Sequence, residues 1–124
     1  MNIAIASDFH FEFHKSDPGW LPSIAPNCDV IVLAGDIGVG NSACDAVLAI
    51  ANEHPLSQVV WVAGNHEFYQ QNIEKQIDFY RRTFSNHERI HFLENETVVI
   101  GDVIFLGCTL WTGFDVLGQE RIDE

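Results

Sequence analysis

Short apolar runs rich in β-branched residues alternate with amphipathic segments along the first part of the chain. Such runs, typical of strands buried on both faces of a sheet, occur at residues 2–7, 29–34 and 58–63. Apolar positions at helical spacing predict one helix over residues 42–53, with Asn41 or Ser42 as its N-cap. A second helix is predicted over residues 72–84, with an apolar stripe formed by Ile73, Ile77, Tyr80 and Phe84. The alternation predicts an α/β fold built from parallel βαβ units.

The pattern changes towards the end of the chain. Three short strands are predicted at residues 90–93, 97–100 and 103–108, and Gly101-Asp102 suits a two-residue hairpin turn. These strands are typical of an antiparallel β-meander. Residues 8–26 contain three of the four prolines and are predicted to form a long loop, either functional or at the rim of a site. No linker or repeat divides the chain, so we expect one domain over residues 1–124.

Composition and charge narrow the classes of function. Hydrophobic residues make up 47% and charged residues 19% of the 124 positions, which excludes a disordered chain. The 18 acidic and 6 basic residues give a net charge of −12, so we expect no nucleic-acid partner. A phosphate-bearing substrate would therefore need bound metal as its source of positive charge. Without an apolar run long enough to cross a bilayer or a signal-peptide pattern, we expect a cytoplasmic protein without a membrane partner.

Polar motifs follow each of the first three predicted strands. They are Asp8-Phe9-His10, Gly35-Asp36 and Gly64-Asn65-His66-Glu67. Because the carboxyl ends of parallel strands meet at one edge of a sheet, these side chains are expected to share a pocket. Their carboxylate, imidazole and carboxamide groups suit one or two ions of Mn, Fe, Zn or Mg. Asp36 is placed centrally, so its carboxylate would bridge the ions where two are bound. The alternative is that they are ordinary turn and cap residues.

In this order and at these strand ends, the motifs resemble the calcineurin-like metallophosphoesterase superfamily. The resemblance covers roughly the first 110 residues and implies half of an α/β sandwich that holds divalent metal ions. Carried over by motif, it implies that Asp8 and His10 hold a first metal, Asp36 bridges to a second, and Asn65 holds the second. It also implies that His66 is the general acid. The family's C-terminal Gly-His-x-His motif is absent from the sequence, so the resemblance implies a truncated domain.

Several other side chains have two interpretations. Glu67 is either a carboxylate at a helix start or a support for the metal ligands. His14 is a surface residue or lines the cleft, and His87 and His91 are structural or form a metal pair. The alternating phenylalanines pack in the core or form a substrate platform; they are Phe9, Phe11 and Phe13. The cysteines are expected to be reduced and mostly buried; they are Cys28, Cys44 and Cys108.

Three functions remain open at this point. The chain is an active phosphoesterase that hydrolyses a small phosphate ester or a phosphoprotein, or it is a truncated member that binds metal or phosphate with little turnover. The third is an interaction module whose unpaired sheet face docks a partner. A half-sandwich leaves that apolar face uncovered, so we also expect a homo-oligomer.

Overall fold

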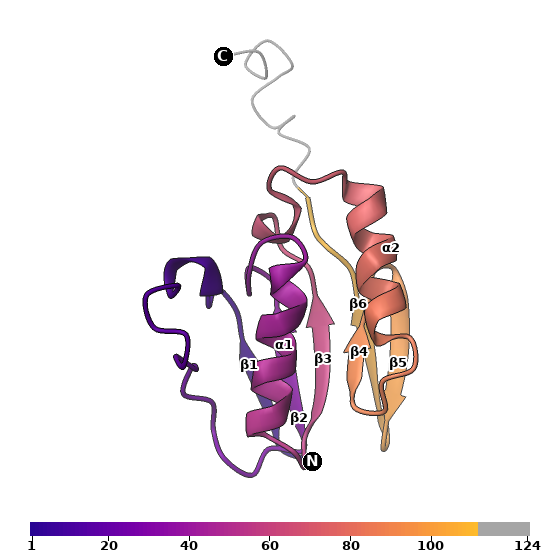
Figure 1. Ribbon diagram of the computed structural model, residues 1–124. Helices are drawn as coiled ribbons and strands as arrows, with labels where there is room; N and C mark the ends of the chain where they lie inside the picture. Colours follow the sequence, from indigo (N-terminus) through magenta and orange to yellow (C-terminus); the bar gives the residue numbers. More distant parts are fainter. Residues whose placement is uncertain (112–124) are drawn as a thin grey trace, which may run out of the picture.

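Four parallel strands form the central sheet of the computed structural model, which describes residues 1–111 (Figure 1). In spatial order they are β1 (Ile3–Ala6), β2 (Val30–Ala34), β3 (Gln58–Val62) and β4 (Ile90–Phe92). A separate antiparallel hairpin consists of β5 (Glu96–Ile100) and β6 (Val103–Gly107). The predicted α/β class is confirmed. The end of the predicted domain, residues 112–124, lies outside the described residues.

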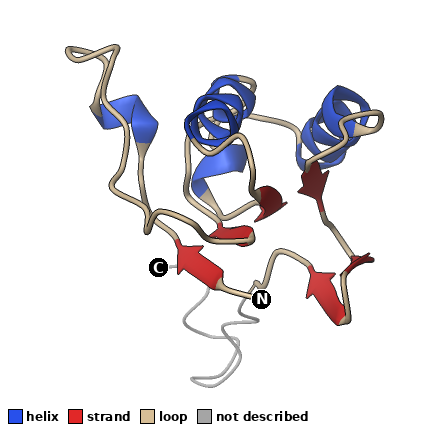
Figure 2. Cartoon of the chain, turned by 90° about the horizontal axis from the view of Figure 1, so that it is seen from below, coloured by secondary structure: helices blue, strands red, loops and turns tan. Residues whose placement is uncertain are grey.

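Both α-helices cover the same face of the sheet (Figure 2). Helix α1 (Ser42–Glu53) connects β2 to β3, and α2 (Ile73–Phe84) connects β3 to β4. Parallel strands in simple sequential order, joined by crossovers of one hand, leave all connecting helices on one side. Two short 3₁₀-helices, η1 (Phe11–Phe13) and η2 (His66–Phe68), shape the loops after β1 and β3.

The N-cap of α1 and the buried face of α2 differ from those predicted from the sequence, whereas α2 has a capping asparagine. Asn72 caps α2, because its Oδ1 accepts a hydrogen bond of 3.0 Å from Lys75 N. Asn41 occupies the N-cap of α1, but its Oδ1 accepts from Gln76 Nε2 at 3.0 Å instead of capping the helix. Ile73, predicted in the stripe, is 45% exposed, whereas Gln76 is buried. Gln76 lies one turn before the buried Tyr80, so it shares the face that meets the sheet.

Each face of the sheet has its own apolar layer. Under the helices lie side chains of β2, β3 and β4, which are Ile31, Leu33, Val59, Trp61, Ile90 and Phe92. On the opposite face, Val30 and Val60 are covered by the hairpin through Val98, Ile100 and Phe105. β4 pairs in parallel with β3, so the parallel part extends further than the pattern indicated, and the antiparallel part is the hairpin. β4 joins the sheet because α2 and β3 bury its apolar side chains.

Some apolar surface stays exposed on the side away from the helices. On β1, Ile3 is 40% and Ile5 is 73% exposed, and on the hairpin Val99, Ile104 and Leu106 are exposed as well. The hairpin thus covers the β3 side of this face and leaves the β1 side open. In the part of the chain that the structure describes, no helix has the length and apolarity needed to span a bilayer.

Candidate metal centre

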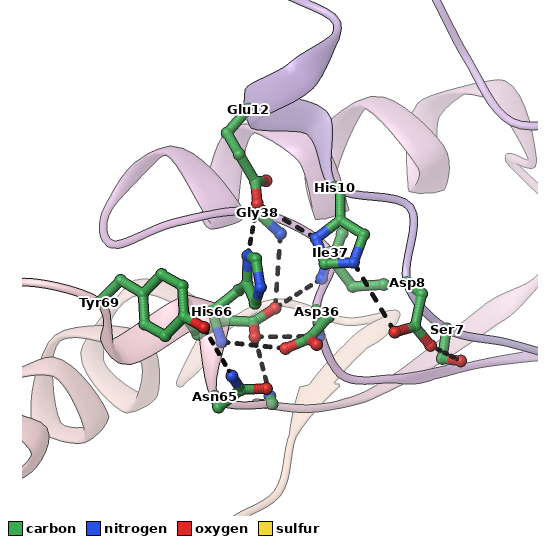
Figure 3. Close-up of polar contacts among 12 residues, drawn as sticks. Ser7, Asp8, His10, Glu12, Asp36, Ile37, Gly38, Asn65, His66 and Tyr69 are labelled. Carbon is green, nitrogen blue, oxygen red and sulfur yellow. Dashed lines mark hydrogen bonds and ion pairs between the residues drawn. The ribbon is translucent and has the colours of Figure 1, made fainter.

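The loops after β1, β2 and β3 meet at the carboxyl edge of the sheet (Figure 3). Asp8 and His10 follow β1, Asp36 follows β2, and Asn65 and His66 follow β3. One donor atom each from His10, Asp36 and His66 lies within 4.8 Å of the other two. The structure therefore brings one residue from each of the three motifs together, as expected for parallel strands whose carboxyl ends are adjacent.

The backbone of the first two loops is unusual at the site residues. Asp8 N donates to Gly35 O at 3.1 Å, and His10 N donates to Asp36 O at 3.0 Å, so the loop after β1 runs along the loop after β2. Asp8, His10 and Asp36 have φ values of 59°, 48° and 56°, in the left-handed region. Residues other than glycine there cost on the order of 1–3 kcal/mol each. The surrounding hydrogen bonds hold this strained backbone, which directs the three side chains.

Two glycines let the loop after β2 approach the loop after β3. A Cβ on Gly64 would lie 2.3 Å from Asp36 Oδ1 and 2.7 Å from Asp36 N. A Cβ on Gly35 would lie 2.9 Å from Gly64 Cα, and φ at Gly35 is +91°, which suits glycine. Because both positions lack a side chain, Asp36 Oδ1 accepts a hydrogen bond of 2.9 Å from His66 N.

Glu67 connects the loop after β2 to the loop after β3 through hydrogen bonds. Its side chain is fully buried, with 0% exposure. It accepts hydrogen bonds from the backbone N–H groups of Ile37 (2.7 Å), Gly64 (2.8 Å), Asp36 (3.0 Å) and Gly38 (3.5 Å). Burial raises the pKa of Glu67, and these hydrogen bonds offset part of that rise. The contacts favour the interpretation of Glu67 as a support for the loops that carry Asp36 and His66.

The two imidazoles of the cluster share one acidic neighbour. Glu12 Oε1 lies 2.7 Å from Nδ1 of His66 and 3.1 Å from Nδ1 of His10, and the two rings are 4.3 Å apart. Burial raises the pKa of Glu12, but hydrogen bonds from its own backbone N–H and from the two rings outweigh this and leave the pKa below its usual value. Glu12 therefore carries a negative charge next to the histidines at neutral pH.

Asp8 and Asn65 flank the cluster on either side. Asp8 is exposed at the rim; its Oδ1 lies 3.7 Å from His10 Nε2, and its Oδ2 accepts from the hydroxyl of Ser7. Asn65 and Tyr69 share a hydrogen bond of 3.0 Å, and the orientation of the amide that satisfies its neighbours directs its NH₂ group to the Asp36 carboxylate. Asp8, Asp36 and Asn65 line a pocket of about 340 Å³ together with residues 108–111.

The donor set fits a divalent cation. Ligand atoms lie about 2.0–2.2 Å from ions such as Zn²⁺, so one ion can contact both Asp8 Oδ1 and His10 Nε2 across their 3.7 Å separation. Carboxylate and imidazole groups suit borderline and hard metals, and no cysteine belongs to the cluster among the described residues. The chemistry of the donors therefore agrees with the metals expected from the sequence.

The other histidines have structural contacts. His87 Nδ1 accepts from the backbone N–H groups of Arg89 and Ile90 at 3.1 and 3.0 Å, and His91 Nε2 lies 2.8 Å from Gln58 Oε1. Within residues 1–111 they belong to no metal-ligating cluster, which favours their structural interpretation. His14 stacks on Trp20 with ring centroids 3.5 Å apart, at the rim of a groove that Glu12 also lines.

Of the three phenylalanines, Phe9 and Phe11 pack against the core, while Phe13 is 71% exposed with its ring 6.4 Å from that of His66. Sequence reasoning missed Glu12 and Tyr69 at the site. The available signal for Glu12 was an acidic residue two positions after His10 in a loop predicted to be functional. Tyr69 carried no such signal, because it reaches Asn65 only through the 3₁₀ turn of η2.

The geometry is that of three strand-end loops that converge on a set of metal-type donors. The family model for calcineurin-like phosphoesterases matches residues 1–119. The chain belongs to this family. A comparison with curated proteins gives no match. Membership in the calcineurin-like phosphoesterase family confirms the resemblance drawn from the motifs, and it agrees with a sheet whose carboxyl edge carries them.

Proposed function

We propose that this calcineurin-like phosphoesterase is a metal-dependent hydrolase of phosphate esters. In the proposed site Asp8, His10, Asp36 and Asn65 hold one or two divalent ions, and His66 is the general acid. For Asn65 to bind an ion, its amide would turn over from the orientation that directs NH₂ to Asp36, so that its oxygen faces the ion. The observation that carries the proposal is the cluster of His10, Asp36 and His66, with donor atoms within 4.8 Å at the edge where three loops meet. The family match supports the same reaction class.

The roles follow from where the side chains lie. Asp36 belongs to the cluster with His10 and lines the same pocket as Asn65, so its carboxylate lies within reach of both sides of the site. When bound, the divalent ion supplies positive charge that polarises the phosphate and activates a water molecule. His66 presents Nδ1 to Glu12, which leaves Nε2 as the ring atom that can pass a proton to the leaving oxygen. The ring of Tyr69, 4.3 Å away, limits the rotation of His66.

The substrate is proposed to be a small phosphate ester or a phosphoprotein. The net charge of −12 opposes the approach of a long polyanion such as nucleic acid. The pocket of about 340 Å³ beside Asp36 is large enough for a phosphate group with a small substituent.

The test combines metal analysis with turnover. The purified chain should bind Mn²⁺ and hydrolyse an aryl phosphate only with metal present. Asp36→Asn should lose both, whereas Asp102→Asn, in the exposed hairpin turn, should keep both. His66→Ala should retain Mn²⁺ and lower kcat by about 10²–10⁴-fold. Unchanged Mn²⁺ binding in Asp36→Asn would refute the assigned site, and Mn²⁺ binding without turnover would support the alternative of a metal-binding or interaction module.

The oligomeric state and the location are further proposals. Association of copies through the open β1 side of the sheet is proposed because Ile3 and Ile5 are exposed there. Sedimentation at micromolar concentration should give a species larger than a monomer, and a well-folded monomer would contradict the proposal. A cytoplasmic location is proposed from the sequence pattern, and fractionation of cells that express the protein tests it.

A further inference from the structure

Glu12 lies between the two histidines of the site and touches both. Its Oε1 is 2.7 Å from His66 Nδ1 and 3.1 Å from His10 Nδ1, and its side chain is only 12% exposed. The neighbouring residue Phe11 packs against the core, and Phe11 N donates to Ile37 O at 2.9 Å. The short helix η1 is therefore anchored by Phe11, which fixes where the Glu12 carboxylate lies.

A carboxylate only accepts hydrogen bonds, so each ring must carry its proton on Nδ1 to bond to Glu12. A neutral ring with the proton on Nδ1 has an unprotonated Nε2, which is free to bind a metal ion or exchange a proton. For His10 this Nε2 is the atom that lies 3.7 Å from Asp8 Oδ1. Histidines that bind metals commonly have a carboxylate at their other nitrogen, which fixes the orientation of the ring.

We infer that Glu12 is a positioning residue that sets the tautomer of both His10 and His66. This inference rests on the proposed function for what each Nε2 then does. At His10 the unprotonated Nε2 binds the metal. At His66, Nε2 takes up a proton from water while Nδ1–H stays bonded to Glu12, and the ring then gives the Nε2 proton to the leaving oxygen. Because Oε1 serves both rings, the metal ligand and the general acid are coupled through one side chain. Removing Glu12 would disturb both roles at once, which distinguishes it from a partner of a single histidine.

A purely structural role fits the contacts less well. Both contacts of the carboxylate with other side chains are to the two histidines, through Oε1. The second oxygen, Oε2, is buried and has no hydrogen-bond partner among the described residues. A buried oxygen without a partner costs on the order of 1–3 kcal/mol, so this carboxylate destabilises η1 and is not explained by a structural role there.

The primary test is ¹⁵N NMR of the histidine rings in the metal-free protein at about pH 8, where ordinary imidazoles are neutral. Wild type should show a protonated Nδ1 and an unprotonated Nε2 for both His10 and His66. In Glu12→Leu no oxygen remains to accept from either Nδ1, so at least one ring should change tautomer. Glu12→Asp keeps the carboxylate and should retain the wild-type tautomers at least in part. Glu53→Leu, on the exposed end of α1, is the matched control and should leave both rings unchanged.

The second measurement concerns function. Glu12→Leu should weaken Mn²⁺ binding by about 10–100-fold, as expected for loss of a group that orients a metal ligand. At saturating Mn²⁺ it should still lower kcat more than it changes KM, because His66 is then misoriented. Rings with a protonated Nε2 in wild type, or tautomers that do not respond to Glu12→Leu, would overturn the inference even if the protein is an active enzyme. If wild type neither binds metal nor turns over, the proposed function fails, while the tautomers still decide the role of Glu12.

Discussion

Replacing Gly64 with alanine tests whether the close approach of two loops builds the site. The new Cβ would lie 2.3 Å from Asp36 Oδ1, about 1 Å short of the 3.4 Å at which ordinary contacts begin. It would also lie 2.7 Å from the backbone N of Asp36, so rotating the Asp36 side chain cannot relieve the clash. The loop after β2 must therefore move, and this loop is also held by Glu67 and by the hydrogen bond from His66 N to Asp36 Oδ1.

The size of the effect follows from the cost of overpacking. An added methyl group in a well-packed position costs about 1–3 kcal/mol. For a chain of this length that corresponds to a fall in Tm of roughly 4–12 °C, measured by circular dichroism or calorimetry. A shift of Asp36 by about 1 Å also exceeds the roughly 0.2 Å tolerance of metal–ligand distances, so Mn²⁺ affinity should fall at least about tenfold by calorimetric titration.

Gly19 provides the matched control, because a Cβ there meets only Asp17 Oδ1 at 3.9 Å. Gly19→Ala should change the free energy of unfolding by no more than about 0.5 kcal/mol and leave Mn²⁺ binding unchanged. Wild-type stability together with wild-type Mn²⁺ affinity in Gly64→Ala would refute the claim that these loops need a glycine at their contact.

Three further predictions concern titratable groups that are buried or half-buried. Glu67→Gln should destabilise the protein in urea by about 1–3 kcal/mol for each loop N–H left unpaired, whereas the exposed Glu74→Gln should have little effect. Burial, with the nearby His87, lowers the pKa of His91. As pH falls through about 6.5, His91 is therefore protonated in the unfolded chain before it is protonated in the folded protein. Wild type should then lose more stability than His91→Gln between about pH 7.5 and pH 5.5, and equal losses would contradict this. Burial raises the pKa of Cys44 to about 11, so a thiol reagent at about pH 8 should label the half-buried Cys108 first, as mass spectrometry of the native protein can show.

Local sequence patterns were enough to predict most elements of the fold. The β-branched runs predicted β1, β2 and β3, and the helical spacing predicted α1 with the bounds observed, Ser42–Glu53. The departures involve contacts between distant segments. Ile73 was assigned to the core by periodicity alone, but it is exposed. Gln76, on the same face as the buried Tyr80 and Phe84, is buried instead and donates to Asn41 Oδ1. Periodicity indicates that a helix has one buried face, and the packing partners decide which residues lie at its margins.

The order of strands and motifs along the chain also determined at which edge of the sheet the site residues lie. Motifs that directly follow three adjacent parallel strands must lie at the carboxyl edge, so the strand order is enough to predict that His10, Asp36 and His66 lie together. Tertiary structure alone decided that Glu12 serves two histidines and that Glu67 accepts from the backbone of two loops. Such contacts depend on the conformation of the loops, which is left-handed at Asp8, His10 and Asp36. They also join residues far apart in the sequence, since Glu12 and His66 are separated by 54 positions. No periodic pattern encodes them, because they arise from the packing of segments that meet only in the folded chain.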